Sequence, residues 1–407
     1  MYIYTMKLLK REHYVRLLES FAGKDVIKVI TGIRRSGKST LFRLFIEKLK
    51  ENGVKDEQIL FYNFEDFSLR KFLENPVNLH EQIIAKASEG KDIYVFLDEI
   101  QKMQNFESFV SSLHLRPNID VYITGSNAYL LSSELSTLLT GRYVQIHILP
   151  FSFKEFLESK QDKSRPDVIF NEYLRFGGMP GIVSSPEILH TQYIKDIFES
   201  IIEKDIMFRH KWHKNNHFER VVKFLLNSIG SQISANNIAN VLKANKIAAS
   251  RNTIENYIEA LTQSYLFYKC SRYDIKGKNI LSTGEKYYVA DLGFKRVLLG
   301  NENTDYGHNL ENIVYLELLR CSDRLYIGKE KEKEVDFVQI DKNGYKNYFQ
   351  VAWTAMDGKT LERELAPLNA IRDSNAKYLL TMDVFSGDSY NGIRKLNMID
   401  WLSNLEV

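Results

Sequence analysis

The first 150 residues alternate between short apolar runs and segments in which apolar residues recur at helical spacing. An uninterrupted apolar run is typical of a strand buried on both faces, and the helical spacing is typical of an amphipathic helix. The expected strands cover residues 26–30, 59–63, 93–97, 121–123 and 143–149, and the expected helices cover 12–21, 41–46 and 77–87. This alternation predicts an α/β fold with a parallel sheet that helices cover on both sides.

The pattern changes after Pro150. Residues 151–210 are helix-periodic except at 176–181, which reads FGGMPG, and they predict a small helical subdomain. The next segment predicts three helices and then two strands, at 218–229, 235–246, 251–261, 266–270 and 286–290. This is the order of a winged helix-turn-helix, with residues 252–261 in the position of the recognition helix.

The final third mixes one helix with several short strands. The expected helix covers residues 310–320, and the expected strands cover 325–327, 335–338 and 348–351. The whole pattern therefore predicts four parts: an N-terminal helix with an α/β core, a helical lid, a winged helix and a small α/β domain. Their expected limits are residues 1–150, 151–210, 211–295 and 296–407.

The composition is that of a folded globular protein with little net charge. Of 407 residues, 44% are apolar, and 55 basic residues against 52 acidic ones leave a formal net charge of +3. A chain this close to neutrality has no global field that draws it to nucleic acid or a membrane, so DNA contact would depend on a local patch. The two cysteines lack metal-type spacing, and no apolar stretch has the length of a signal peptide or a membrane span. We therefore expect a cytoplasmic protein with no membrane partner.

Residues 32–40 fit the template G-x-x-x-x-G-K-[ST] at every fixed position. An expected strand precedes the motif and an expected helix follows it, which is the setting in which backbone amides and a helix N-terminus cradle phosphate groups. An ordinary glycine-rich turn would not need these flanks. We expect Lys38 to reach the β- and γ-phosphates of ATP and the Ser39 hydroxyl to bind Mg2+. The predicted nucleotide-binding residues are Gly32, Ile33, Arg34, Arg35, Ser36, Gly37, Lys38, Ser39 and Thr40.

An acidic pair ends the strand expected at 93–97. A carboxylate at the C-terminal edge of a parallel strand can complete the Mg2+ shell, and this is the role expected for Asp98. Glu99 would polarise the water that attacks the γ-phosphate. The alternative, an ordinary acidic pair at a strand end, is less consistent with a phosphate loop upstream and with the regular strand spacing.

Two further positions are candidates for catalysis. Ser126 and Asn127 follow the next expected strand, and we favour Asn127 because its amide both donates and accepts hydrogen bonds. The alternative there is a helix N-cap. Arg142, before the last strand, would stabilise charge on the transferred phosphoryl group in its own subunit or in a neighbour of a homo-oligomer. The alternative for Arg142 is an ordinary surface arginine.

Four motifs occur together at residues 32–40, 96–99, 124–127 and 141–153, and three more at 176–180, 334–338 and 349–351. In this combination the chain resembles the AAA-type ATPases of bacteria and archaea, and more narrowly the branch with a C-terminal domain of unknown function. The resemblance implies binding of ATP and Mg2+ and hydrolysis on an αβα core with a helical lid. It also implies that Asn63, at the end of the second expected strand, restrains the catalytic glutamate until a partner binds.

The final third resembles a restriction-endonuclease-like fold, whose metal chemistry uses an acidic residue and then (D/E)-x-K on a paired strand. Glu311 or Glu317 would be the helical acid, and Asp336 matches the central aspartate. Where (D/E)-x-K is expected, the chain reads Gln350-Val351-Ala352. A neutral amide is a poorer ligand for Mg2+ than a carboxylate, and alanine cannot stabilise a developing phosphate charge. We therefore expect an inactive nuclease-like domain that is kept for binding.

A mixed basic and aromatic segment covers residues 209–217. His210, His213 and His217 have helical spacing, yet no carboxylate or cysteine completes a metal-ligand set. A basic surface that meets phosphate is a second interpretation. A linker helix with a solvated face is the favoured one.

These features favour an ATP hydrolase that acts as a switch or motor on a nucleic-acid or protein partner, which the winged helix recognises. One alternative is a nucleotide-loaded DNA-binding regulator with negligible hydrolysis, and another is an ATP-gated nuclease. The expected recognition helix follows Arg251 but carries Glu255 and Glu259, which is unfavourable for phosphate contact. A P-loop kinase is disfavoured because Asp98 followed by Glu99 suits attack by water better than transfer to an acceptor.

Overall fold

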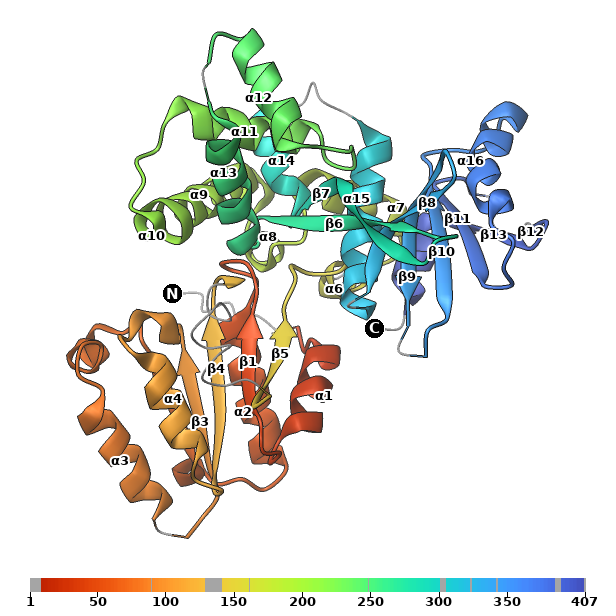
Figure 1. Cartoon of the computed structure of the whole chain (residues 1–407). Helices are drawn as coiled ribbons and strands as arrows, with labels where there is room; N and C mark the ends of the chain where they lie inside the picture. Colours follow the sequence, from red (N-terminus) through yellow and green to blue (C-terminus); the bar gives the residue numbers. More distant parts are fainter. Residues whose placement is uncertain are drawn as a thin grey trace. The chain divides into compact units, whose positions relative to one another are not determined.

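Two sheets organise the chain in the computed structural model (Figure 1), which describes residues 9–88, 90–128, 141–160, 162–247, 249–300, 305–322, 324–341, 343–384 and 389–405. The first unit contains residues 1–150 together with 263–265, and the second contains residues 151–262 and 266–407. The change of pattern at residue 150 therefore coincides with a boundary between compact units. The expected boundaries at residues 210 and 295 fall inside the second unit.

The first unit is built on five parallel strands in the order β2-β3-β4-β1-β5. The strands are β1 (Ile27–Thr31), β2 (Ile59–Asn63), β3 (Ile93–Asp98), β4 (Ile119–Gly125) and β5 (Tyr143–His147). Each contains one of the apolar runs, so the predicted parallel sheet is confirmed. The run expected at 143–149 ends as a strand at His147.

Helices cover both faces of this sheet. They are α1 (Glu12–Phe21), α2 (Lys38–Glu51), α3 (Val77–Ala87) and α4 (Phe106–His114), with short 3-10 turns η1 (Asp56–Gln58), η2 (Phe67–Phe72) and η3 (Ile100–Lys102). Successive strand residues point to opposite faces. Val95 and Leu97 therefore pack with α3 and α4, whereas Phe96 packs with α1 and α2. The result is the three-layer αβα arrangement that the sequence predicts.

The strand order determines where a ligand can bind. After β1 the chain crosses to β2 at one edge, and after β4 it passes β1 to reach β5 at the other edge. Connections therefore leave β1 and β4 in opposite directions, which opens a crevice outside the C-terminal ends of these two strands. The phosphate loop follows β1 and the polar residues 126–127 follow β4, so both lie at this point.

The first half of the second unit is helical. Its elements are α6 (Phe153–Ser159), α7 (Pro166–Phe176), α8 (Pro180–Val183), α9 (Glu187–Ser200), the π-helical segment η5 (Ile201–Met207), α10 (Phe208–His210), α11 (Asn216–Asn227), α12 (Ala235–Ala244), α13 (Arg251–Gln263) and α14 (Leu292–Leu299). Side-chain caps begin several of them. Ser152 and Glu155 form a capping box on α6, and Asn215 and Ser234 cap α11 and α12. The helices expected at 218–229, 235–246 and 251–261 thus form close to their predicted limits.

The second half of this unit contains a mixed sheet in the order β12-β13-β11-β10-β9-β8-β6-β7. The strands are β6 (Phe267–Asp274), β7 (Asn279–Val289), β8 (Leu325–Glu330), β9 (Lys333–Ile340), β10 (Lys346–Val351), β11 (Ala376–Thr381), β12 (Ser389–Tyr390) and β13 (Ile393–Asn397), with helices α15 (Tyr306–Cys321), α16 (Gly358–Ala370) and α17 (Met398–Asn404). The hairpin β6–β7 is the one expected as a wing, and β6 pairs in parallel with β8. The expected winged helix and C-terminal domain therefore share one sheet.

The glycine-rich segment 176–181 is held by a buried carboxylate at the start of α14. The Asp291 carboxylate caps α14 through the Gly293 amide at 2.8 Å and accepts from the Gly178 amide at 2.7 Å. A Cβ at Gly177, where φ is 77°, would collide with this carboxylate. Burial raises the pKa of Asp291 to about 7, although three backbone amides oppose the rise.

Among the described helices, none has the length and apolar character needed to cross a bilayer.

Candidate functional site

The phosphate loop lies between buried strand β1 and the N-terminus of α2. All five residues of β1 are buried, so this strand holds the first residues of the loop in place. Gly32 has φ 148° and Gly37 has φ 99°, and a Cβ at Gly32 would collide with the Ile148 carbonyl oxygen. These positions need glycine because the backbone must curl closely. The helix then begins at Lys38, which turns the N-terminus of α2 toward the loop.

Lys38 points back over the loop that it follows. Its ammonium donates to the carbonyl oxygens of Gly32 and Ile33 at 3.0 and 3.2 Å, and it lies 4.0 Å from Glu99 Oε1. The side chain is almost fully buried. The structure therefore brings the predicted phosphate-binding lysine and the predicted catalytic glutamate together. Of the neighbouring arginines, Arg34 lies 3.9 Å from Glu65, and Arg35 is exposed with φ 69°.

A buried arginine that the sequence did not indicate also contacts the phosphate loop. Arg11 precedes α1, and its guanidinium donates to the carbonyl oxygens of Ser36 and Leu149, both at 2.9 Å. The guanidinium also lies over the Tyr14 ring, at 4.6 Å from its centroid. Its two partners are 25 and 138 positions away in the chain. No local pattern could have indicated this contact.

The acidic pair at the end of β3 is positioned by a threonine from β4. The Thr124 hydroxyl donates to Asp98 Oδ1 at 2.6 Å and accepts from the Glu99 backbone amide at 2.9 Å. Asp98 and Thr124 are fully buried. One hydroxyl therefore fixes both members of the pair, and it does so from the strand that lies between β3 and β1.

Glu99 combines a strained backbone with a perturbed carboxylate. Its φ is 56°, an unfavourable value for a residue with a side chain and one that is common at functional sites. Burial raises the pKa of the Glu99 carboxyl above its ordinary value, and Lys38 opposes this rise while Asp98 adds to it. The Gln101 side-chain amide donates to Glu99 Oε2 at 2.6 Å. A buried carboxylate with a raised pKa beside a lysine is suited to accept a proton.

Several buried polar atoms at this edge lack a partner among the residues that the structure describes. They include Ser36 Oγ, Asp98 Oδ2 and Asn127 Oδ1. Buried polar atoms are normally hydrogen-bonded, so three unsatisfied oxygens near one loop are consistent with a site for phosphate groups and a cation. The donor set of carboxylate and hydroxyl oxygens, with Ser39 at the start of α2, also suits Mg2+. Ser126 is buried beside Asn127.

Asn63 lies where the resemblance places it but makes a different contact. It ends β2 in register with Asp98 of β3. Its side-chain oxygen accepts from the Glu65 backbone amide at 2.9 Å, which shapes the turn after the strand. In the described structure the contacts of the Glu99 carboxylate are with Gln101 and Lys38. A restraint of Glu99 by Asn63 therefore remains an expectation.

Arg142 lies away from the residues above. It precedes β5, and its backbone carbonyl accepts from the Ile27 amide at the start of β1. Since β1 and β5 are parallel, Arg142 is at the N-terminal edge of the sheet, and the phosphate loop is at the C-terminal edge, about 15 Å away for a strand of this length. This placement does not support the expected role at its own subunit's phosphate loop. A role in a neighbouring subunit stays a prediction, and an ordinary surface arginine is the alternative for this exposed residue.

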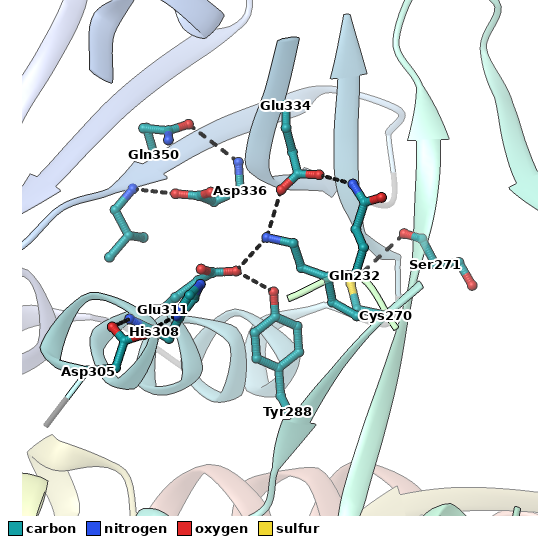
Figure 2. Close-up of polar contacts among 12 residues, drawn as sticks. Gln232, Cys270, Ser271, Tyr288, Asp305, His308, Glu311, Glu334, Asp336 and Gln350 are labelled. Carbon is teal, nitrogen blue, oxygen red and sulfur yellow. Dashed lines mark hydrogen bonds and ion pairs between the residues drawn. The ribbon is translucent and has the colours of Figure 1, made fainter. Parts of the chain in front are cut away.

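A second cluster of acids lies in the second unit (Figure 2). Glu311 of α15 and Asp336 of β9, both named from the sequence, are brought together with Glu334 of β9 and Lys286 of β7, which the sequence reasoning missed. The Lys286 ammonium lies 3.0 Å from Glu311 Oε1 and 2.8 Å from Glu334 Oε1. Glu317 is instead paired with Arg320, which donates to it at 3.2 Å.

The remaining sequence candidates do not form a metal site. His210 stacks on Trp212 with ring centroids 4.4 Å apart, and Trp212 packs edge-on against Tyr257. Within the described ranges, no group of three or more His, Cys, Asp or Glu side chains has the arrangement of metal ligands. His210 is therefore part of an aromatic contact that reaches Tyr257 of α13 through Trp212.

Known proteins resemble the chain in sequence and fold. An AAA domain matches residues 24–157, and a domain of unknown function (DUF8612) matches residues 168–305. An uncharacterized protein of Haemophilus influenzae is 37% identical over 399 residues, covering 97% of this chain and 98% of its own. The uncharacterized protein MJ1544 of Methanocaldococcus jannaschii is 31% identical over 383 residues, covering 90% and 82%.

One solved structure extends the comparison to the fold. The Walker-type ATPase paby2304 of Pyrococcus abyssi superposes with a TM-score of 0.50 at 14% identity, covering 72% of this chain and 96% of that one. The phosphate loop, the acidic pair and the strand order lie within the segment that the AAA domain matches. The chain therefore belongs to the family of AAA-domain P-loop ATPases in which a domain of unknown function follows the ATPase domain.

Proposed function

We propose that the chain binds ATP with Mg2+ at the phosphate loop and hydrolyses it, with Glu99 as the residue that activates water. The observation that carries the proposal is the convergence of Lys38, Asp98 and Glu99 at one edge of the sheet. Lys38 lies 4.0 Å from Glu99, and the Thr124 hydroxyl donates to the Asp98 carboxylate and accepts from the Glu99 backbone amide. The match to an AAA domain and the similarity to a Walker-type ATPase support ATP as the nucleotide.

Each residue has a role that follows from its chemistry. The loop amides and Lys38 would bind the phosphate oxygens, and the buried loop would exclude water from them. Mg2+, when bound, would be held by Ser39 and Asp98 and would neutralise phosphate charge. Glu99 would accept a proton from the attacking water, and Asn127 would orient that water or the γ-phosphate through its amide.

The substitution Glu99→Gln tests the hydrolysis step. Glutamine keeps the shape of the side chain but cannot accept the proton, so we expect ATP binding within about threefold of wild type and a turnover reduced by about 100-fold or more. Binding is measured with a fluorescent ATP analogue and turnover by phosphate release. The matched control is Glu57→Gln, an exposed acid in η1, which should change neither quantity. Undiminished phosphate release in the Glu99 variant would remove Glu99 from the mechanism.

We further propose that ATP turnover is a switch or motor for a macromolecular partner bound by the helices α11–α13 and the hairpin β6–β7. Their order supports a winged-helix-like module. The exposed face of α13 carries Glu255 and Glu259, and Arg251 is paired with Glu255 at 2.7 Å, so this face offers little positive charge to phosphate. These charges favour a protein partner over DNA.

Measuring ATP turnover and DNA binding together separates the two partner classes. With a protein partner, duplex DNA should leave turnover unchanged and should not shift in a mobility assay at low salt. The alternative function, a nucleotide-loaded DNA-binding regulator, requires the reverse: DNA binding with a steep salt dependence and negligible turnover. Strong turnover that DNA does not affect would exclude the regulator.

A further inference from the structure

Arg11 connects the phosphate loop to the stretch of chain that leaves the first unit. Its guanidinium donates to the Ser36 carbonyl oxygen within the loop and to the Leu149 carbonyl oxygen, each at 2.9 Å. The Leu149 amide in turn donates to the Tyr14 hydroxyl of α1 at 3.3 Å. Side chains at the start of α1 therefore fix both backbone groups of Leu149. One residue later the chain reaches Pro150, where the main segment of the first unit ends.

Arg11 itself has a backbone conformation that a residue with a side chain rarely adopts. Its φ is 46°, in the left-handed region, and its side chain is almost fully buried. Such a conformation persists only where the surrounding contacts fix the residue, and it is common at functional positions. The guanidinium presents its donors in a fixed plane, so it also holds its two carbonyl partners at defined positions relative to each other.

The neighbouring Ile148 touches the first residue of the loop. Its amide donates to the Thr31 carbonyl oxygen at 2.8 Å, and its carbonyl oxygen lies where a Cβ at Gly32 would collide. Packed backbone transmits a displacement because no void absorbs it. A change in the course of the loop therefore reaches this stretch of chain at two points, at Gly32 by direct contact and at Ser36 through Arg11.

The first residue of the second unit, Phe151, is also fixed through both of its backbone groups. Its amide donates to the Gly178 carbonyl oxygen at 2.7 Å, and its carbonyl oxygen accepts from the Tyr173 hydroxyl at 2.9 Å. The Gly178 amide donates to the Asp291 carboxylate at 2.7 Å. A Cβ at Gly178 would collide with the Phe151 carbonyl oxygen, so this close approach needs glycine. The glycine-rich segment 176–181 thus binds the residue with which the second unit begins.

Only Pro150 separates these two fixed residues in the sequence. Leu149 is bonded within the first unit, and Phe151 is bonded within the second. The pyrrolidine ring fixes φ of Pro150, so the joint has little freedom to absorb a displacement. A movement of Leu149 is therefore passed along the chain to Phe151 and to its partners.

Binding of phosphate changes the hydrogen bonds that hold the loop. The Lys38 ammonium donates to the carbonyl oxygens of Gly32 and Ile33 in this structure. A phosphate oxygen is a charged and therefore stronger acceptor, so it draws the ammonium away from these carbonyl groups. The loop backbone then loses two hydrogen bonds and readjusts between Gly32 and Ser36, the two points at which it meets residues 148–149.

We propose that Arg11 is a positioning residue that couples ATP binding at the phosphate loop to the glycine-rich segment 176–181. When ATP binds, the loop readjusts, and Arg11 carries this change to Leu149 and from there along the chain to Gly178. Asp291, which binds Gly178, begins α14, and α14 packs against α11 of the proposed partner-binding module. This coupling rests on the proposed function, because ATP is the ligand that moves the loop. It adds the route by which the nucleotide state reaches the second unit.

Hydrogen exchange measured by mass spectrometry tests the coupling in the full chain. The probe is a non-hydrolysable ATP analogue with Mg2+, and the peptides of interest contain the amides of Gly178 and Gly293, which donate to Asp291. We expect the analogue to slow exchange of these amides about threefold or more in the wild-type chain. Arg11→Met keeps an unbranched side chain and removes the guanidinium, so the response should disappear even when the analogue saturates the site.

The matched control is Arg16→Met, at an exposed arginine on α1, which should keep the full response. If Arg11 only stabilised the fold, Arg11→Met would melt at a lower temperature but keep the nucleotide-dependent change in exchange, and that result would overturn the proposal. So would a wild-type chain that binds the analogue without any change at Gly178 or Gly293. Binding is measured in the same samples by competition with a fluorescent ATP analogue. A chain that does not bind the analogue would contradict the proposed function, and the coupling with it.

A variant in the second unit covers the case in which Arg11→Met does not fold. Tyr173→Phe removes only the hydroxyl that donates to the Phe151 carbonyl oxygen and keeps the ring, which packs against Phe153. We expect the response at Gly178 to fall by about half or more at saturating analogue, because one of the bonds that fix Phe151 is lost. An unchanged response in Tyr173→Phe would contradict transmission through this residue.

Discussion

The two units each place a lysine beside buried acids, but they differ in which groups hold the lysine and in whether nearby buried polar atoms have hydrogen-bond partners. In the first unit Lys38 binds the carbonyl oxygens of Gly32 and Ile33 and stands 4.0 Å from Glu99. In the second unit Lys286 contacts Glu311 and Glu334 directly, at 3.0 and 2.8 Å. The first lysine is held by the backbone, and the second is held by the acids themselves.

The surrounding polar atoms show the same difference. Ser36 Oγ, Asp98 Oδ2 and Asn127 Oδ1 are buried and without a partner among the described residues of the first unit. The acids around Lys286 each accept a hydrogen bond from a separate donor. Unsatisfied buried oxygens favour a ligand, whereas a cluster that satisfies itself favours a fixed structure. The comparison therefore separates a site that binds from a site that stabilises.

The largest expected effect is on stability, in Lys286→Met. Removing one partner of a buried ion pair leaves carboxylates without compensation, and we expect a loss of about 3–5 kcal/mol in the free energy of unfolding. Denaturant unfolding of the second unit measures it. Lys269→Met is the matched control, since Lys269 on β6 is 48% exposed and its pair with Glu285 should contribute less than about 1 kcal/mol. Equal losses of unfolding free energy in Lys286→Met and Lys269→Met would show that burial of the Lys286 ion pairs adds nothing to stability.

Lys38→Met should weaken ATP binding strongly and change stability little. Because backbone carbonyls rather than acids hold Lys38, we expect a stability change of only about 1 kcal/mol. ATP binding should weaken by about 100-fold, since a charge-assisted contact to phosphate is lost. Titration with a labelled nucleotide measures the affinity, and Lys50→Met, in the last turn of the same helix, is the control. Unaltered ATP affinity in Lys38→Met would contradict the assigned site.

Thr124→Val tests whether the Thr124 hydroxyl positions the acidic pair of the first unit. Valine keeps the shape of threonine but removes the hydroxyl that links Asp98 to the Glu99 amide, so we expect a kcat reduced by about 10- to 100-fold with a small change in KM. Thr124→Ser restores the hydroxyl and should recover most of the activity. If the serine variant is as slow as the valine variant, the effect is due to packing and not to positioning of the acids.

The smallest expected effect concerns pH. Burial raises the pKa of Glu99, so ATP turnover should fall on acidification at a pH above that of an ordinary glutamate. The folded chain binds this proton more tightly than the unfolded chain, so the contribution of Glu99 to stability decreases as pH rises between the two pKa values. Gln101→Leu removes a hydrogen bond that favours the ionised form and should move the acid limb of the kcat profile to higher pH. If the acid limb of the kcat profile stays at the same pH in Gln101→Leu, a group other than Glu99 determines it.

The sequence determined the elements whose signals are local. The phosphate loop lies within residues 32–40, and the acidic pair follows its strand directly, so motif and flanks were visible together. Helix positions such as α1 and α13 followed from the spacing of apolar residues, and the parallel sheet from the alternation of runs. These features depend on short-range geometry, which the order of residues fixes.

Tertiary structure alone decided the contacts between distant parts of the chain. Arg11 reaches Leu149 across 138 positions, and Lys286 reaches Glu311 across 25, and neither residue has neighbours that suggest a role. Only the strand order placed Arg142 at the edge opposite the phosphate loop, and only the pairing of β6 with β8 merged the expected wing with the C-terminal sheet. A residue pattern encodes which face of an element is buried, but the partner on that face is chosen by packing over the whole unit.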